Sequence, residues 1–192
     1  MLPDDLKDKL TAVDSSRKKR LETAQWITER PGYVFETLQR CFTADSDLLV
    51  KASWVLELIC ENQPHLFIKH TPVFFERLST IRTDSALRSC AKICQQLCYE
   101  HYRPESKNYG KILTRDERKK MTECCFDWLI TDQKVACQAP AMEALYYLGK
   151  ETMGAWIYPE LKNILTENSP NKSAGYQARA RKILKRISGA VS

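Results

Sequence analysis

Three cysteines are spaced in a way that could place their thiols together. Cys90, Cys94 and Cys98 recur every four residues, so on a helix they would lie along one face. Three thiolates on one face could bind a soft metal ion, but zinc sites usually combine close ligands from a turn with ligands from elsewhere. The same positions belong to an apolar stripe, in which cysteine behaves as a small hydrophobic residue. We therefore predict that these cysteines belong to the core, and we predict no metal site.

The three histidines give no catalytic pattern. His65 and His70 are five residues apart, whereas a helical metal pair needs a spacing of four, and His101 stands alone. The sequence contains no His-Glu-x-x-His, no Gly-x-Ser-x-Gly and no glycine-rich phosphate loop. Any of the eight cysteines could lie beside any histidine, so no nucleophile–base pair can be assigned. We predict no catalytic residue and no cofactor, and we expect a protein that is not an enzyme.

Two tryptophans lie close to carboxylates. Trp54 comes three residues before Glu57, and Trp128 follows Asp127. An aromatic ring beside a carboxylate could hold a cationic group, although a tryptophan in an amphipathic helix more often packs in the core. Glu57 lies within a strongly apolar stretch, residues 53–59. It would either face a binding surface or form a salt bridge with a neighbouring helix.

Basic residues gather at two places. One cluster is Arg17-Lys18-Lys19-Arg20, and the other lies in the segment after residue 170, which has six basic residues and no acidic one. This segment accounts for the whole net charge of +6. Basic side chains on a helix can bind phosphates of a nucleic acid, or they can form a solvated face that suits the helix dipole. The basic C-terminal patch consists of Arg179, Arg181, Lys182, Lys185 and Arg186.

The composition is that of a soluble helical protein. Apolar residues make up 43% of the 192 residues and charged residues 28%, and only 6 glycines and 8 prolines are present. No run of about 18 apolar residues exists, so we expect no membrane span. The acidic start of the chain, Met1-Leu2-Pro3-Asp4-Asp5, does not resemble a hydrophobic export signal. We therefore expect a cytoplasmic protein whose thiols are reduced.

One motif recurs along the chain. It has Asp at the first position, an aliphatic residue three positions later, a basic residue four positions later and a core residue seven positions later. The last two copies are degenerate, because the third lacks the basic residue and the fourth lacks both the Asp and the basic residue. The four copies are Asp47, Val50, Lys51, Trp54; Asp84, Leu87, Arg88, Ala91; Asp132, Val135, Ala136, Ala139; and Ser173, Tyr176, Gln177, Ala180.

A helix is expected ahead of each copy. Thr114 and Glu117 form a capping-box pattern at the start of one of these helices, and Pro72 should break or bend another. Pro140 should kink the motif helix over 133–149. The helices expected ahead of the four motif copies are 31–42, 64–81, 115–130 and 156–167, and each is followed by a motif helix. A leading pair of helices is expected at 4–12 and 15–29.

The order of proline, apolar helix, Asp, basic residue and second helix resembles the HEAT repeat. The resemblance covers repeats at 31–62, 64–101, 114–151 and 155–188, with a capping pair at 1–30 and an insertion at 102–113. It implies a single all-α domain, a right-handed α–α superhelix of about four to five helix pairs whose second helices line a concave surface. It also implies a ladder between adjacent repeats made by Asp47, Lys51, Asp84, Arg88 and Asp132.

This resemblance implies an interaction scaffold without catalytic activity. The expected partner is a protein bound by the concave face, and the alternative is a nucleic acid, because some HEAT-like bacterial proteins act on alkylated DNA through a basic channel. No membrane partner is expected. The concave-face candidates are Lys51, Trp54, Glu57, Arg88, Lys92, Gln95 and Tyr99.

The chain also resembles small bacterial HEAT-like proteins that can carry the name adenylosuccinate lyase. The resemblance includes the stretches Ala-Lys-Ile-Cys at 91–94 and Cys-Phe-Asp-Trp-Leu at 125–129. Members of that lyase family are far longer and use a loop of the form Ser-Ser-x-Met-Pro-x-Lys-x-Asn. The one Ser-Ser of this chain, Ser15-Ser16, is followed by Arg17-Lys18-Lys19-Arg20. Lyase activity is therefore the third and least favoured function.

Overall fold

The computed structural model describes residues 3–44, 46–103 and 112–190, and these residues form helices and connecting turns without any strand. The all-α class predicted from the sequence is therefore confirmed. The helices are α1 Asp4–Thr11, α2 Arg17–Thr28, α3 Gly32–Arg40, α4 Ser46–Asn62, α5 Pro64–Ile68, α6 Thr71–Arg77, α7 Asp84–Tyr102, α8 Arg115–Ile130, α9 Val135–Leu148, α10 Ile157–Asn168 and α11 Ala174–Ala190, with short 3-10 turns η1 Leu78–Thr80, η2 Thr152–Gly154 and η3 Ser169–Asn171.

The helix starts follow local signals in the sequence. Thr114 caps α8, because its hydroxyl accepts a hydrogen bond from the Glu117 N–H at 3.2 Å and the Glu117 carboxylate accepts one from the Thr114 N–H at 2.8 Å. The predicted capping box is thus confirmed. Ser16 caps α2 in the same way, through the Lys19 N–H. Such bonds satisfy backbone donors that a helix end leaves without partners.

Two prolines that the sequence singled out, Pro72 and Pro140, lie in different positions of their helices. The helix expected over 64–81 is divided into α5 and α6, and Pro72 lies in the first turn of α6. A proline fits there, because the N–H that it lacks would have no partner in the helix. Pro140 lies inside α9, which begins at Val135 rather than at residue 133. Most of the insertion predicted at 102–113 lies outside the described residues, and Tyr102 is the last residue of α7.

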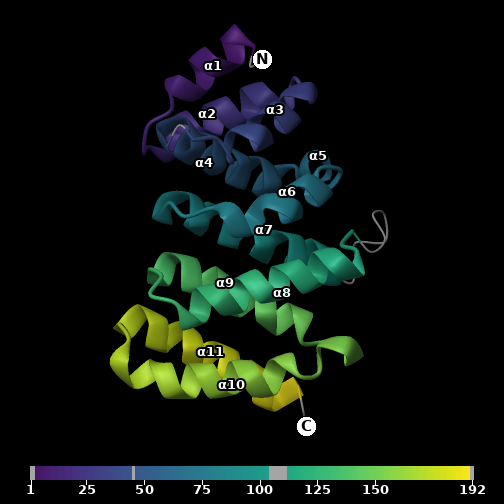
Figure 1. The fold of residues 1–192 in the computed structure, drawn as a ribbon, viewed down its shortest axis with the longest axis vertical. Coiled ribbons are helices and arrows are strands. Elements are labelled where there is room, and N and C mark those ends of the chain that lie inside the picture. Colours follow the sequence, from purple (N-terminus) through teal and green to yellow (C-terminus); the bar gives the residue numbers. More distant parts are fainter. Residues whose placement is uncertain (1–2, 45, 104–111, 191–192) are drawn as a thin grey trace. The chain divides into compact units, whose positions relative to one another are not determined.

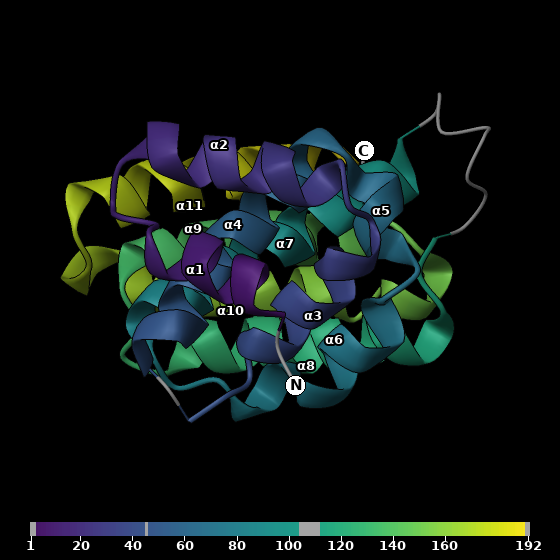
Figure 2. The same cartoon turned by 90° about the horizontal axis from the view of Figure 1, so that it is seen from above.

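The chain divides into two compact units, Met1–Ile93 and Cys94–Ser192, with the boundary inside α7. In unit 1, α4 packs against α1, α2, α3 and α5, and α2 lies beside it in both views (Figure 1, Figure 2). The apolar face of α4 is buried, and Val55, Leu56 and Ile59 have no exposed area. Helix α4 therefore organises the core of unit 1.

In unit 2 the central helix is α9. It packs against α8, α10 and α11, which are seen around it in Figure 1. Residues 140–146 of α9 are all buried: Met142, Ala144 and Leu145 have no exposed area, and Glu143 and Tyr146 are also buried. A helix segment that is covered on all sides is apolar all round, which explains why α9 shows little amphipathic period.

All eight cysteines are buried, which confirms the core position predicted for Cys90, Cys94 and Cys98. The sulfur atom of Cys98 lies 3.2 Å from the sulfur of Met121. Burial raises the pKa of the Cys41 and Cys98 thiols well above the usual range, so these thiols stay protonated and unreactive at neutral pH. None of the helices in the described part of the chain combines the length and apolar character that a membrane span requires.

We expect replacement of the cap residue of α8, Thr114→Ala, to lower the free energy of unfolding by about 1 kcal/mol, because the Glu117 N–H loses its acceptor. Urea unfolding followed by circular dichroism measures this change. The matched control is Thr166→Ala at an exposed position within α10, where alanine favours the helix and stability should stay equal or rise. An equal response of both variants would contradict the capping role.

Candidate functional site

The buried carboxylate of Glu57 is held by three residues of the neighbouring helix. Glu57 lies on α4 with 6% of its surface exposed. The Ser89 hydroxyl donates a hydrogen bond to Oε2 at 2.6 Å, Lys92 Nζ donates one to Oε1 at 2.7 Å, and Arg88 Nη1 lies 3.7 Å from Oε2. All three partners belong to α7. Of the two alternatives that the sequence left open, Glu57 therefore takes the salt bridge with a neighbouring helix.

Next to Glu57 on α4, a basic and an aromatic side chain of unit 1 contact each other. The guanidinium of Arg20 on α2 lies over the ring of Trp54 on α4, 5.4 Å from its centroid. Trp54 precedes Glu57 by three residues, so the two share a face of α4. We call this set the unit 1 row, and it carries three basic side chains against one carboxylate. Its residues are Arg20, Trp54, Glu57, Arg88 and Lys92.

A second buried carboxylate is held in a similar way in unit 2. Glu143 on α9 is 8% exposed, and Arg186 Nη1 on α11 donates a hydrogen bond to its Oε1. The Arg186 guanidinium also lies 3.8 Å from the centroid of the Tyr146 ring. Burial alone would lower the pKa of Arg186, but the hydrogen bonds and charge interactions with Glu143 and Tyr146 together outweigh this effect, so the pKa lies above its usual value. Arg186 is therefore fixed as a cation between a carboxylate and an aromatic ring.

Aromatic rings extend the contact on this side of unit 2. Tyr147 meets the edge of the Tyr99 ring, with 6.5 Å between the centroids, and lies 5.7 Å from the Arg186 guanidinium. Lys150 Nζ lies 5.0 Å from the centroid of the Tyr147 ring. Tyr99 is 44% exposed, so a large aromatic side chain is open to a partner here. We call Tyr99, Glu143, Tyr147 and Arg186 the unit 2 row.

Two residues of the ladder implied by the HEAT resemblance, Lys51 and Arg88, make contacts between helices of unit 1. Lys51 pairs with Asp47 of its own helix, at 2.9 Å, and its ammonium group also donates a hydrogen bond to the carbonyl oxygen of Thr11 at 2.8 Å. Lys51 thus does join two helix pairs, but through a backbone carbonyl. Arg88 reaches Glu57 of the preceding pair. Glu57, in the middle of α4, thus connects α4 to α7, and the repeat pattern did not include it among the ladder residues.

The remaining predicted residues are divided between surface and core. Gln95 is half-buried and Tyr99 exposed on α7. Trp128 is buried, so together with the exposed Asp127 it does not form a cradle for a cation. Within the basic C-terminal patch, Arg186 is half-buried by its contacts with α9, whereas the other four residues face solvent. These four are Arg179, Arg181, Lys182 and Lys185.

A buried network around His101 was not identified from the sequence. The Leu113 N–H donates a hydrogen bond to His101 Nδ1 at 3.2 Å, so the proton of a neutral ring is on Nε2, which lies 3.8 Å from Glu151 Oε1. Arg118 Nε lies 3.3 Å from the other oxygen of Glu151. The three side chains come from α7, α8 and the turn after α9. Their wide separation in sequence explains why no local motif revealed them.

This chain has no match among known protein families, curated proteins or solved structures. Its chemistry must therefore be argued from its own side chains. In the part of the chain that the structure describes, no group of three or more His, Cys, Asp or Glu residues could hold a metal ion. The arrangement instead provides two rows of half-exposed basic and aromatic side chains, each built around a buried carboxylate.

We expect Arg186→Met to lower the free energy of unfolding by about 3 kcal/mol, because it leaves the buried Glu143 without its cationic partner. Methionine keeps much of the apolar stem that packs on Tyr146, so the change reports mainly on the charge. Urea unfolding checks this expectation. Arg179→Met, on the exposed face of the same helix, should change stability by no more than about 0.5 kcal/mol. Similar losses in both variants would show that the Glu143 contact does not stabilise unit 2.

Proposed function

We propose that this chain is a HEAT-like scaffold without catalytic activity that binds an acidic protein partner through its second helices, the later helix of each pair. The proposal includes the arrangement of the helix pairs as a right-handed α–α superhelix whose second helices line the concave face. It is supported by the succession of helix pairs, from α1 and α2 to α10 and α11. A stack of such pairs buries a continuous core and offers an extended binding face.

The observation that carries the proposal is the burial of the two carboxylates beneath basic side chains. Glu57 and Glu143 are almost inaccessible, whereas Arg88 and Lys92 keep about a third of their side-chain surface exposed. A partner would therefore meet cationic groups and the aromatic ring of Tyr99 rather than the acidic groups. Arginine, tyrosine and tryptophan are the residues that most often dominate binding energy at protein interfaces. Acidic side chains of a partner would complement such a surface.

The groups that could perform chemistry are held in structural contacts, which supports a role in binding. The Glu57 carboxylate accepts hydrogen bonds from two side chains, and Glu143 accepts one from Arg186. The His101 side chain is 1% exposed and lies between the Leu113 N–H and Glu151. The cysteines are buried. A general base or nucleophile must be able to reach a substrate, and these groups are covered by their own partners.

Nucleic-acid binding is the second candidate function, and the exposed part of the C-terminal patch favours it. Arg179, Arg181, Lys182 and Lys185 face solvent on α11. Such side chains neutralise phosphates and release counterions, which makes the affinity fall steeply with salt. The patch lacks exposed aromatic side chains of its own helix, which single-stranded nucleic acids use for stacking. The protein partner therefore remains the main proposal.

The test is affinity capture by the immobilised protein from an extract of its source cells at low salt, with quantitative mass spectrometry. We expect an acidic protein to be captured, and we expect Arg20→Gln/Lys92→Gln to reduce its recovery about tenfold, because both changes remove positive charge from the unit 1 row. Lys7→Gln/Lys69→Gln removes the same charge from exposed positions of unit 1 outside this row. This control should recover the partner at the wild-type level.

Fluorescence anisotropy with labelled duplex and single-stranded DNA across a salt series provides the second arm. The proposal would give way to nucleic-acid binding if the affinity for DNA fell steeply with salt, if Lys182→Glu/Lys185→Glu abolished DNA binding, and if no protein were captured. Equal recovery of the partner by the row variant and by its control would also overturn the proposal. Thermal unfolding of both variants verifies that they remain folded.

A further inference from the structure

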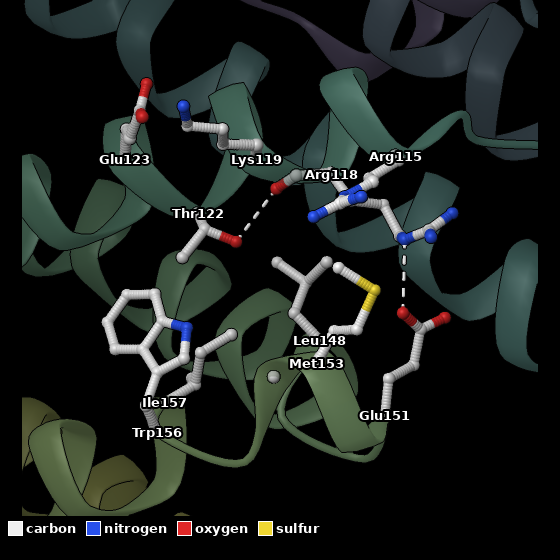
Figure 3. Close-up of a pocket in the computed structure, with 11 residues that line it drawn as sticks. Arg115, Arg118, Lys119, Thr122, Glu123, Leu148, Glu151, Met153, Trp156 and Ile157 are labelled. Atoms are coloured by element: carbon white, nitrogen blue, oxygen red, sulfur yellow. Dashed lines mark hydrogen bonds and ion pairs between the residues drawn. The ribbon is translucent and has the colours of Figure 1, made fainter.

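A separate pocket of about 260 Å³ lies between α8 and the segment that connects α9 to α10 (Figure 3). It shares no residue with the two rows on the second helices. Basic side chains of α8 form one side, and apolar side chains from the connecting segment form the other. Arg115, Arg118 and Lys119 belong to the basic side, and Met153 and Trp156 belong to the apolar side.

The basic side of the pocket comes from one face of α8. Arg115 and Lys119 are four residues apart and exposed. Arg118 lies between them and is held in place, because Nη1 donates a hydrogen bond to the Leu113 carbonyl at 2.6 Å and Nε lies 3.3 Å from Glu151. One fixed and two solvent-facing cations therefore border the pocket. An anionic group of a ligand could pair with the two solvent-facing cations.

The apolar side presents two large side chains to solvent. Trp156 is 56% exposed and Met153 is 57% exposed, and both labelled side chains border the pocket in Figure 3. The Trp156 ring stacks on Phe126, with 5.5 Å between centroids and 25° between ring planes, so the indole is positioned before any ligand arrives. Clustered exposed apolar side chains mark interaction sites more often than isolated ones. Tryptophan and methionine are also enriched at protein interfaces.

Gly154 fixes the turn that carries these two side chains. A Cβ atom at this position would lie 2.3 Å from the carbonyl oxygen of Leu148. Only glycine therefore allows η2 to pack directly against the C-terminal end of α9. The close backbone contact keeps Met153 and Trp156 next to α8, and it explains a glycine that no motif in the sequence accounted for.

We propose that this pocket binds a peptide segment of a partner protein in which a carboxylate lies next to a large apolar side chain. The apolar side chain packs between Trp156 and Met153, and the carboxylate pairs with Arg115 and Lys119. The volume is below the range of about 300–1,000 Å³ that is usual for small-molecule and cofactor sites, and it suits an amino-acid side chain. This inference goes beyond the function proposed for the second helices and does not depend on it.

The charges that line the pocket favour a peptide over a nucleic acid. Glu123 and Glu151 lie on the same lining as the three basic residues. A phosphate backbone brings a continuous row of negative charges, and some of these would meet the two carboxylates. A peptide brings separate carboxylates, and one of them can be placed beside Arg115 and Lys119 while the neutral backbone passes Glu123. The pocket therefore discriminates by the position of a charge rather than by total charge.

The probe is an end-blocked peptide, Gly-Ser-Glu-Leu-Glu-Ser-Gly, titrated into the ¹⁵N-labelled full chain at low salt. The reporter is the indole N–H signal of Trp156 in NMR spectra, assigned from the loss of one of four indole signals in Trp156→Phe. We expect this signal to shift and to saturate. Peptides with Gln-Leu-Gln or Glu-Ala-Glu at the centre should bind about tenfold more weakly, because each loses one of the two anchors.

Charge variants of α8 test the basic side of the pocket. Arg115→Glu/Lys119→Glu should weaken binding about tenfold or more, and thermal unfolding verifies that the variant remains folded. Lys120→Glu/Lys162→Glu, which makes the same change of charge at two exposed positions of unit 2 outside the lining, is the matched control and should change the affinity less than about twofold. Equal effects of the two variants would indicate general charge attraction and overturn the proposed site.

Apolar variants and competing ligands complete the test. Trp156→Ala should abolish peptide binding, measured by anisotropy of the labelled peptide, whereas Ile130→Ala at another exposed apolar position should not. No saturable shift, or the same shift with adenosine monophosphate or an oligothymidylate, would overturn the proposal. Arg20→Gln/Lys92→Gln should bind the peptide like the wild type, so failure of this site and failure of the second-helix scaffold can be told apart.

Discussion

The structure depends on the requirement that a carboxylate inside a packed helical core must have partners of its own. An unpaired charge in such a place would cost several kcal/mol. Glu57 and Glu143 meet this requirement through side chains of another second helix, α7 for Glu57 and α11 for Glu143. These contacts fix the angle and register at which the helices pack, because a shift by one residue would remove the partner. The carboxylates thus act as specific connectors in cores that are otherwise apolar.

The same arrangement determines what the second helices present to solvent. The acidic groups are used inside the protein, while the longer basic side chains keep part of their length outside and run beside tyrosine and tryptophan rings. The same ion pairs therefore stabilise the core and determine which side chains the second helices expose. The pocket on α8 follows another design, in which one cation is fixed by Glu151 and two others remain solvent-facing. The two proposed binding surfaces therefore differ in character although they belong to one simple fold.

The local features could be predicted from the sequence, and the long-range ones could not. Helix pairs, the Thr114 cap, the break at Pro72 and the burial of the cysteines depend on neighbouring residues or on the period of one helix. The bonds of Glu57 to α7 and of Glu143 to α11 join residues that are 32 and 43 positions apart. His101, Arg118 and Glu151 meet only after three segments have packed. The pocket was missed for the same reason, because Trp156 and Lys119 carry no shared motif.

The buried stretch of helix α9 contains a single ionised residue, and this has a consequence for the synthesis and refolding of the chain. Before unit 2 closes, the stretch from 141 to 148 exposes an apolar surface whose only charge is Glu143. Charged residues within such stretches suppress self-association of unfolded chains. Glu143 therefore serves the protein twice: while the chain is still open it opposes aggregation, and after closure it is neutralised by Arg186.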